Sequence, residues 1–435
     1  IAKKVSPPMK NIEIPYEKER NRRYRFFEAL PGLLSWSILA LPLVLSLISA
    51  TVAAICVVMY LLIYFARAVG VTTRALQGNA RVLKYKKLDW MRLLDDVEAE
   101  EVNIPPSKRP EWHAENIARL KVRPAVVKPS ELIHVAMIAT YNESREVLEP
   151  TVQSVVASDY DLKKVILVIA YEGRDGAQSE QTSLDLIKEY GHHFKHAFAV
   201  KHPLTEGEVR GKGGNITYAA RELTKYVEKQ KIDPLHVLVT TLDADNRPDK
   251  KYFAALSYVY CLSPDPLHTS YQPVSIYTNN IWDAPAPMRV IATGNSYWNT
   301  MLMARQHMLR NFSAHAQSLA SLIDTDYWSV RTIVEDGHQF WRTYFRYDGK
   351  HQVFPIYVPI YQDAVLAETY RKTLKAQFVQ LRRWTWGASD VAYFVDKGFF
   401  SKNKVPKFDK WFKLGRLLEG HVSWAVAPPL LAFAA

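Results

Sequence analysis

The sequence predicts an α/β protein whose mainly parallel, doubly wound sheet follows a pair of membrane-spanning helices. From Leu132 onward, short continuous apolar runs alternate with amphipathic segments of helical spacing, which is typical of a parallel sheet covered on both faces. Before that point, no charged residue lies between Glu28 and Arg67. The 435 residues, 48% of them hydrophobic, suffice for one large core or two ordinary ones.

The uncharged segment between Glu28 and Arg67 is too long for one membrane span. A single helix of that length would reach roughly 60 Å, whereas the hydrocarbon core of a bilayer is about 30 Å thick. The sequence therefore predicts two transmembrane helices, 30–48 and 52–67, joined by a tight turn at "ISAT". The alternative is a buried helical pair in a soluble protein.

Basic residues flank this hairpin on both sides. By the positive-inside rule they place both of its ends in the cytoplasm, which predicts an integral protein of the inner or plasma membrane with its globular domain on the cytoplasmic side. The two cysteines, Cys56 and Cys261, are too few for a disulfide framework and agree with a reducing compartment. The flanking cations are Lys18, Arg20, Arg22, Arg23 and Arg25 before the hairpin and Arg67, Arg74, Arg81, Lys84, Lys86 and Lys87 after it.

Composition divides the chain into six expected segments. A proline-bearing connector precedes the globular domain, and after that domain a segment that mixes Trp, Phe and Leu with Lys and Arg has the composition of a helix in the headgroup plane. The final segment resembles the start of a further transmembrane helix that is cut short. The segments are a basic cytoplasmic stretch 1–28, the transmembrane hairpin 29–69, the connector 70–130, the globular domain 131–395, the amphipathic interfacial helix 396–420 and the last apolar stretch 421–435.

Within the globular domain, strands and helices are expected to alternate. In parallel sheets ligands collect where strands end at their carboxyl edge, so the residues that follow each strand are candidates for ligand binding. The first strand ends in "TYNE", the second in "YEGRDG" and the fourth in "LDADNRPD". The expected strands are 132–140, 163–171, 196–201 and 235–242, and the helices between them are 144–158, 179–194 and 213–230.

The fourth strand end carries the pair Asp243 and Asp245, separated only by Ala244. Both carboxylates can approach one hard divalent cation such as Mg2+ or Mn2+, which would bridge two phosphate oxygens of a nucleotide. The same letters also build ordinary turns, so the pattern alone leaves both interpretations open.

Three further stretches supply candidate residues. "VRGKGGNITYAA" places Lys212 beside glycines at a helix entry, which suits phosphate oxygens or simply starts a helix. "TIVEDGHQFWR" offers the adjacent acids Glu335 and Asp336, candidates for proton chemistry or for a helix start favoured by the macrodipole. "QFVQLRRWTWG" puts three residues on one face of a helix, which is also the pattern of a structural amphipathic helix: Gln380, Arg383 and Trp384.

The order of these motifs adds information that no single motif carries. "TYNE", the acidic second strand end, "GKGGN", "DAD", "VED" followed by Arg342, and "QLRRW" together resemble the motifs of membrane-embedded family 2 glycosyltransferases. Cellulose, chitin and hyaluronan synthases belong to that family. The resemblance covers Leu132 to Phe394, and its last element, Gln-x-x-Arg-Trp, is specific.

The resemblance implies a GT-A fold that binds a nucleotide-diphosphate sugar, expected to be a UDP-sugar, with Mg2+ or Mn2+ as cofactor. Carried over position by position, it gives each candidate a role. Tyr141 and Glu143 would border the base and ribose, Glu172 would take the acidic base-binding position, Lys212 would lie near the diphosphate, Asp243 and Asp245 would hold the metal, Asp336 beside Glu335 would be the general base, and Gln380, Arg383 and Trp384 would shape the acceptor end and hold the leaving diphosphate.

The implied reaction is a single inverting displacement onto an acceptor hydroxyl of a polysaccharide, glycan or lipid at the bilayer. Two positions depart from the family pattern: Val334 stands where a Thr is usual, and Glu172 replaces the usual Asp. The stretch between "ATGNSYWNTML" and "LASLIDTDYWSV" differs from the synthases in detail, which leaves the acceptor open.

Two other classes of function fit some features of the sequence. The formal net charge of +12 is compatible with nucleic-acid binding, but the basic residues cluster beside apolar segments and form no known nucleic-acid motif, so no nucleic-acid partner is expected. A non-catalytic membrane scaffold with a degenerate transferase domain is the second alternative. The joint presence of Asp245, Asp336 and Arg383 argues against it, because a scaffold needs none of them.

Overall fold

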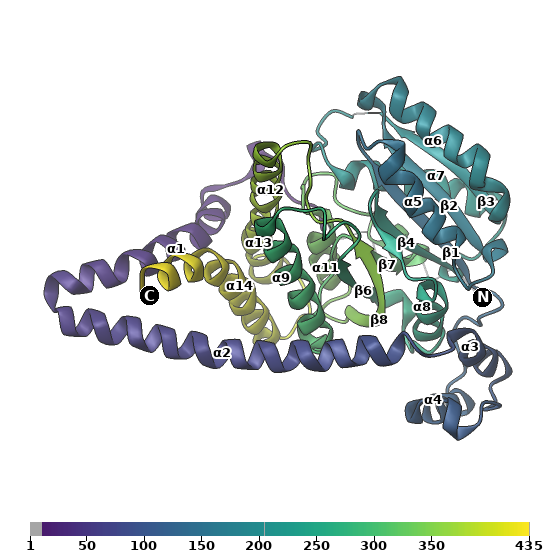
Figure 1. Ribbon diagram of the computed structural model, residues 1–435, viewed down its shortest axis with the longest axis horizontal. Helices are drawn as coiled ribbons and strands as arrows, with labels where there is room; N and C mark the ends of the chain where they lie inside the picture. The colour runs from purple at the N-terminus through teal and green to yellow at the C-terminus, as the bar shows by residue number, and fades with distance from the viewer. Residues whose placement is uncertain (1–10, 204, 435) are drawn as a thin grey trace.

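The computed structural model describes residues 11–203 and 205–434 and confirms the α/β class (Figure 1). Its core is an eight-stranded sheet in the order β3-β2-β1-β4-β7-β6-β8-β5. The strands are β1 (Ile133–Thr140), β2 (Val165–Glu172), β3 (His196–His202), β4 (Val237–Asp243), β5 (Arg247–Pro248), β6 (Thr269–Tyr277), β7 (His315–Ser318) and β8 (Gln352–Gln362).

Helices surround the sheet and extend away from it at one end. They are α1 (Arg22–Ile48), α2 (Ala50–Tyr85), α3 (Trp90–Ala99), α4 (Glu111–Val122), α5 (Arg145–Val156), α6 (Ala177–Tyr190), α7 (Lys212–Lys229), α8 (Tyr252–Cys261), α9 (Ala286–Met303), α10 (Leu319–Asp324), α11 (Glu335–Arg346), α12 (Tyr370–Thr385), α13 (Asp390–Phe399) and α14 (Lys407–Ala434).

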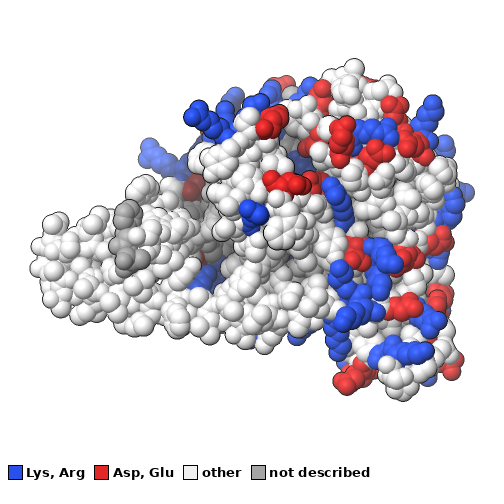
Figure 2. All heavy atoms as spheres, viewed as in Figure 1, with Lys and Arg blue, Asp and Glu red and all other residues white. Residues whose placement is uncertain are grey.

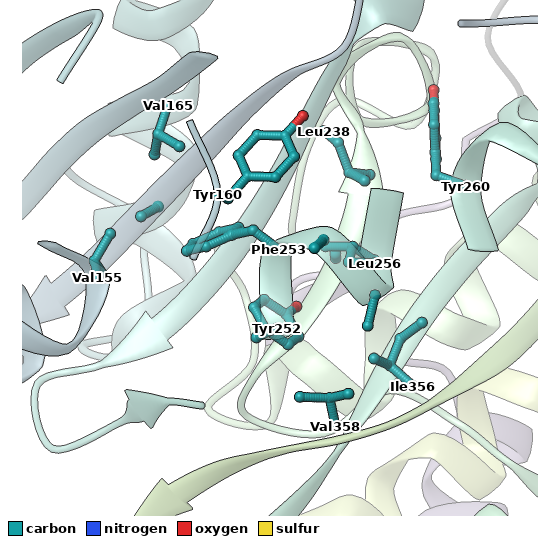
Figure 3. Close-up of a cluster of buried hydrophobic side chains, with 14 of the residues drawn as sticks. Val155, Tyr160, Val165, Leu238, Tyr252, Phe253, Leu256, Tyr260, Ile356 and Val358 are labelled. Atoms are coloured by element: carbon teal, nitrogen blue, oxygen red, sulfur yellow. The ribbon is translucent and has the colours of Figure 1, made fainter. Parts of the chain in front are cut away.

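Both faces of the sheet are buried around β1, β2 and β4, which explains why these three strands are mostly apolar. Alternate residues of β1, β2 and β4 point to opposite faces. On one face Ile138 packs in a core that also contains side chains of α5 and α8. On the other face Val135 packs with side chains of α7 and α10. Figure 3 shows part of the first core, where Tyr252, Phe253 and Leu256 of α8 lie among Val155, Leu238, Ile356 and Val358.

The sheet is parallel only in part. β3, β2, β1 and β4 are parallel neighbours, and β6 pairs parallel with β8. β7 is antiparallel to both β4 and β6, and the short β5 is antiparallel to β8. The predicted mainly parallel sheet therefore describes the half formed by β1 to β4. The other half is mixed, and its strands lie in a region of the chain where the apolar pattern predicts no strand.

Two described helices are long and apolar enough to cross a membrane, α1 and α2. They contain the predicted spans 30–48 and 52–67, pack against each other and are separated by Ser49 alone. In Figure 2 the end of the molecule that they form with the end of α14 shows almost no charged side chain on the visible face, whereas charged residues cover the sheet half.

The segment 70–130, expected to be a connector, is largely helical. α2 continues well past Arg67 to Tyr85, and α3 and α4 follow it. Trp90, Leu93 and Ile117 are buried in the same core as β1 and α8. This segment therefore belongs to the packing of the globular domain, because its amphipathic helices bury their apolar faces against the sheet half.

The C-terminal region is one long helix where two segments were expected. α14 begins at Lys407 and runs through the predicted boundary near residue 420. Leu414 and Leu417 are buried, and the helix packs against α1 and α13. Of the predicted terminal segments, residues 1–10 and 435 lie outside the described residues.

Helix α2 approaches α9 closely enough to require a glycine. A Cβ added to Gly78 would lie 2.1 Å from the backbone oxygen of Thr300. We predict that Gly78→Ala lowers the free energy of unfolding by about 1–3 kcal/mol, because the two backbones must separate. Thermal unfolding of the detergent-solubilised protein measures this. Gly294→Ala, also helical but with open space around the added Cβ, is the matched control and should not destabilise. Equal Tm values for the Gly78 variant and the wild type would contradict the packing described.

Candidate active site

The candidate residues gather at the carboxyl ends of β1, β2 and β4. In the register of the sheet Asp243 is the partner of Ala139, and Thr140 is the partner of Tyr171. The three strand ends therefore lie side by side, with Tyr141 to Glu143 following β1, Glu172 ending β2 and Asp243 ending β4. This is the edge at which the sequence predicted ligand binding.

Lys212 and Asp243 form the central ion pair of this edge. The Nζ of Lys212, the first residue of α7, lies 2.6 Å from Oδ1 of Asp243 and 2.7 Å from the carbonyl oxygen of Ser313. Burial alone would raise the pKa of Asp243, but the charges of Lys212 and Arg383 lower it below its ordinary value. Burial alone would lower the pKa of Lys212, but the surrounding carboxylates raise it above its ordinary value. Both members of the pair are therefore charged.

Asp245 is placed among like charges. Its Oδ2 accepts a hydrogen bond from the backbone N–H of Asp363 at 3.2 Å, and its Oδ1 accepts one from the Asn246 amide at 2.9 Å. Burial, followed by the negative charges of Asp243 and Asp363, raises the pKa of Asp245 to about 7. A cation bound beside this carboxylate would reverse that effect.

The donor set fits a divalent cation only in part. Within residues 11–203 and 205–434, no group of three or more His, Cys, Asp or Glu side chains is arranged to hold a metal ion. Asp243 and Asp245 are two carboxylates at one strand end, and Mg2+ commonly binds through one or two carboxylates with phosphate oxygens and water completing its shell. Asp243 and Asp245 could therefore supply part of the ligand shell of such a cation, but not all of it.

Helix α11 begins with the two predicted acids, but they lie in different environments. Glu335 is 5% exposed, and burial followed by the charge of Asp336 raises its pKa to about 8. Asp336 is partly exposed, accepts a hydrogen bond from the Gly337 N–H at 2.7 Å, and has a raised pKa because of burial. Because Asp336 is the more exposed of the two, it is the better candidate for an acid that faces a ligand.

Gly213 allows α7 and α11 to meet. A Cβ at this position would lie 2.4 Å from the backbone oxygen of Ser329 and 3.0 Å from Cβ of Glu335. A larger residue would push the start of α11 away from Lys212. The glycines of "GKGGN" are therefore explained by close packing as well as by loop flexibility.

The carboxylates of Asp243, Asp245 and Asp336 lie near enough to Tyr277, the last residue of β6, for their charges to act on its hydroxyl. Burial raises the pKa of Tyr277, and the carboxylates of Asp245, Asp243 and Asp336 raise it further. Arg383 of α12 acts on the same group of carboxylates, because its charge lowers the pKa of both Asp243 and Asp336. Charged residues from segments far apart in the sequence thus lie within one another's electrostatic influence.

The predicted base-binding residues form a second group beside the first. Glu143 accepts hydrogen bonds from the Thr140 hydroxyl at 2.9 Å and from the backbone N–H of Tyr141. The Arg174 guanidinium lies 4.4 Å from the centre of the exposed Tyr141 ring. Burial raises the pKa of Glu143, as does the charge of Asp243 to a smaller degree, so this group adjoins the metal-binding candidates.

Glu172 is held in an internal network. It is 3% exposed and lies 3.3 Å from both Nε of Arg174 and Nδ1 of His202, whose other ring nitrogen is 3.0 Å from Glu208. Direct hydrogen bonding of Glu172 to a base would require some of these contacts to open.

Of the three predicted residues on α12, only Arg383 is linked to the carboxylates by the interactions found among the described residues. The Gln380 side-chain oxygen accepts a hydrogen bond from Gln377 at 3.0 Å, within the helix. Trp384 is partly buried and lies one turn after Gln380 on α12.

Sequence reasoning missed Tyr277, Asp363 and the carbonyl of Ser313. Tyr277 ends β6, and Asp363 directly follows β8, so both stand where polar strand ends collect. Tyr277 and Asp363 are polar residues at or just after the end of a strand, the pattern by which the other candidate residues were found. Using it required the pairing of β6 with β8 and β7, which the local pattern does not reveal.

The N-terminal residues that the structure describes brace the catalytic candidate helix. Glu13 lies 3.4 Å from Arg342 of α11 and accepts a hydrogen bond from the Ser329 hydroxyl. The Tyr393 hydroxyl donates to the carbonyl of Ile12 at 2.6 Å. Arg342, which the sequence motif singled out, therefore has a structural role in positioning α11.

Comparison with known proteins finds solved structures with a partly similar backbone fold but low sequence identity. No protein-family model matches the chain, and no curated protein matches it. Among solved structures, it is similar to the mannosyltransferase PcManGT from Pyrobaculum calidifontis in complex with GDP-Man and Mn2+, at 16% identity and TM-score 0.45 over 84% of this chain and 86% of that one. It is also similar to S. aureus TarS 1-349 in complex with UDP, at 13% identity and TM-score 0.42 over 67% and 72% of the two chains. At such TM-scores, the function proposed below rests on the chain's own residues.

The raised pKa of Asp245 makes the stability of the ligand-free protein depend on pH. Because the folded-state pKa of about 7 exceeds the ordinary value of 3.8, the stability contribution is full below pH 3.8 and is lost as the pH rises through 7. We predict that Asp245→Asn raises Tm by several degrees at pH 8 and by less at pH 4.5. Thermal unfolding without divalent cations tests this, with Asp185→Asn on α6 as control. A Tm change that is the same at both pH values would show that Asp245 is not held among like charges.

Proposed function

We propose that this chain is a metal-dependent, inverting family 2 glycosyltransferase with a GT-A fold. It would move a sugar from a nucleotide-diphosphate sugar, expected to be a UDP-sugar, to an acceptor hydroxyl at a membrane. The observation that carries the proposal is the ion pair of Lys212 with Asp243 at the carboxyl ends of β1, β2 and β4, within the electrostatic influence of Asp336 and Arg383. Paired acids at a strand end, a separate acid on a helix and two cations suit phosphate-leaving-group chemistry.

The donor would bind along the edge formed by β1, β2 and β4. Its base and ribose would lie beside Tyr141 and Glu143, where the exposed Tyr141 ring offers a stacking surface backed by Arg174. Its diphosphate would lie between Lys212 and Arg383. Asp243 and Asp245 would hold Mg2+ or Mn2+, which when bound neutralises phosphate charge.

The residues of the chain account for the displacement. Asp336 accepts the proton of the acceptor hydroxyl while that oxygen forms a bond to the anomeric carbon. The bond from that carbon to the diphosphate breaks on the opposite side, and its electron pair leaves with the diphosphate, so the configuration inverts. Lys212 and Arg383 stabilise the charge that develops there. The raised pKa of Asp336 strengthens it as a base, and Glu335 remains protonated beside it at neutral pH.

The acceptor end would be formed by α12. Arg383 lies toward the carboxylates, and Trp384 and the 57% exposed Trp386 provide ring faces on which a sugar can stack. The acceptor would be a polysaccharide, a glycan or a lipid. The apolar helices α1 and α2 support placement of the reaction at a bilayer, with the catalytic domain on the cytoplasmic side as the basic flanks predict.

We predict that Asp336→Asn lowers turnover of the donor by about 100-fold or more, because the amide cannot accept the acceptor proton. The measurement is release of nucleoside diphosphate from a panel of UDP-sugars in the presence of Mn2+. Binding of UDP, followed by calorimetry, should change little. Glu228→Gln, an exposed carboxylate on α7, serves as the control for charge removal.

Two results would contradict this account. Unchanged release in Asp336→Asn would remove Asp336 as the base. A wild-type protein that binds UDP but releases none from any donor, with Asp336→Asn behaving identically, would favour the non-catalytic scaffold.

A further inference from the structure

A group of arginines lies where α2, α9 and α14 meet, and it involves none of the residues of the candidate active site. We define the arginine cluster as Arg67, Arg74, Arg305 and Arg416. Arg67 and Arg74 are seven residues apart on α2, hence on one face, and Gly70 lies between them on that face. Arg305 follows α9, and Arg416 is on α14.

Contacts bring these side chains together. A guanidinium nitrogen of Arg305 lies 3.9 Å from the sulfur of Met308, and one of Arg416 lies 3.6 Å from the same sulfur. Nη2 of Arg305 would also be 4.0 Å from a Cβ added to Gly70, so its head group rests on α2. Arg67 and Arg416 both pair with the carboxylate of Glu419.

The cluster carries more positive charge than its surroundings balance. The ion pairs found among the described residues give it one carboxylate, Glu419, for four guanidinium groups. Burial lowers the pKa of Arg305, and the charges of Arg74, Arg416 and Arg67 lower it further. The other three arginines of the cluster are therefore close enough to Arg305 to repel its charge. Such a concentration of like charge is costly unless an anion binds there.

The surroundings of the cluster are apolar. Arg67 is the first charged residue after the uncharged stretch of α1 and α2, and Phe65 and Val69 beside it are 68% and 52% exposed. On α14, Trp411 and Trp424 are 63% and 45% exposed on either side of Arg416. Side chains of Arg67 and Arg416 are each 36% exposed, so a ligand can reach them.

We propose that the arginine cluster binds the phosphate of an anionic lipid headgroup. A guanidinium fork matches phosphate oxygens in a bidentate manner, and Trp side chains are typical of the membrane interface. The phosphate would replace the missing negative charge between Arg305, Arg416 and Arg74, and the acyl chains would lie along the exposed apolar residues of α2 and α14. A free phosphate ion offers the same headgroup chemistry without the chains. The site would thus anchor the polar end of the helical hairpin to an anionic lipid.

Thermal unfolding of the delipidated, detergent-solubilised full chain tests the proposal. The additives are phosphatidylglycerol, phosphatidylcholine with the same acyl chains, and inorganic phosphate. Phosphatidylglycerol should raise Tm in a saturable manner, and the other two should have little effect at the same concentrations. In the double variant Arg305→Gln, Arg416→Gln, the phosphatidylglycerol concentration for half of the effect should rise about tenfold or more.

The matched control removes two arginines elsewhere, Arg92→Gln with Arg119→Gln, whose side chains on α3 and α4 are 67% and 75% exposed. It should respond to phosphatidylglycerol as the wild type does. If the glutamine pair fails to fold, Arg305→Lys with Arg416→Lys keeps both charges and should still bind more weakly, because lysine lacks the fork. Equal responses to both lipids, or an unchanged response in the cluster variants, would overturn the proposal. A full response to inorganic phosphate alone would replace the lipid by a soluble phosphate ligand.

Discussion

The ion pair between Lys212 and Asp243 is the constraint on which the arrangement of the candidate site depends. It joins the first residue of α7 to the last residue of β4, and its lysine also bonds the carbonyl of Ser313 just before β7. Its positive charge lowers the pKa of Asp243 and opposes the effect of burial on the pKa of Glu335 and Asp336. Without a cation at this point, three buried or partly buried acids would repel one another and favour protonation or separation of α11 from β4.

The rest of the site is arranged around that pair. Gly213 lets α11 approach the start of α7, where Glu335 is buried and Asp336 lies within the electrostatic influence of Asp243. Arg342 of α11 pairs with Glu13, which links the N-terminal end of the described chain to the helix that begins at the candidate site. The site is therefore assembled from elements that the sheet, and not the local sequence, brings together.

The sequence was informative wherever a local pattern carries a physical requirement. Continuous apolar runs predicted β1 to β4, and the absence of charge between Glu28 and Arg67 predicted the larger part of α1 and the first part of α2, up to Arg67. It was uninformative about β5 to β8, because their pairing depends on contacts between distant segments. For the same reason, Tyr277 and Asp363 could not be predicted as site residues from the local sequence. It also explains why Glu172, correctly placed at a strand end, proved to be enclosed by Arg174 and His202, since burial of a side chain depends on neighbours in space.

The central claim is that Asp243, Asp245, Lys212 and Asp336 surround one metal-bound diphosphate. A crystal structure of the chain with UDP and Mn2+, using the anomalous signal of manganese, tests it most directly. The account predicts a manganese peak between the Asp245 carboxylate and the diphosphate, with Lys212 and Arg383 on the phosphate oxygens and Asp336 facing the open side. A manganese or nucleotide bound elsewhere, or Asp245 and Asp336 opening into separate cavities, would contradict it.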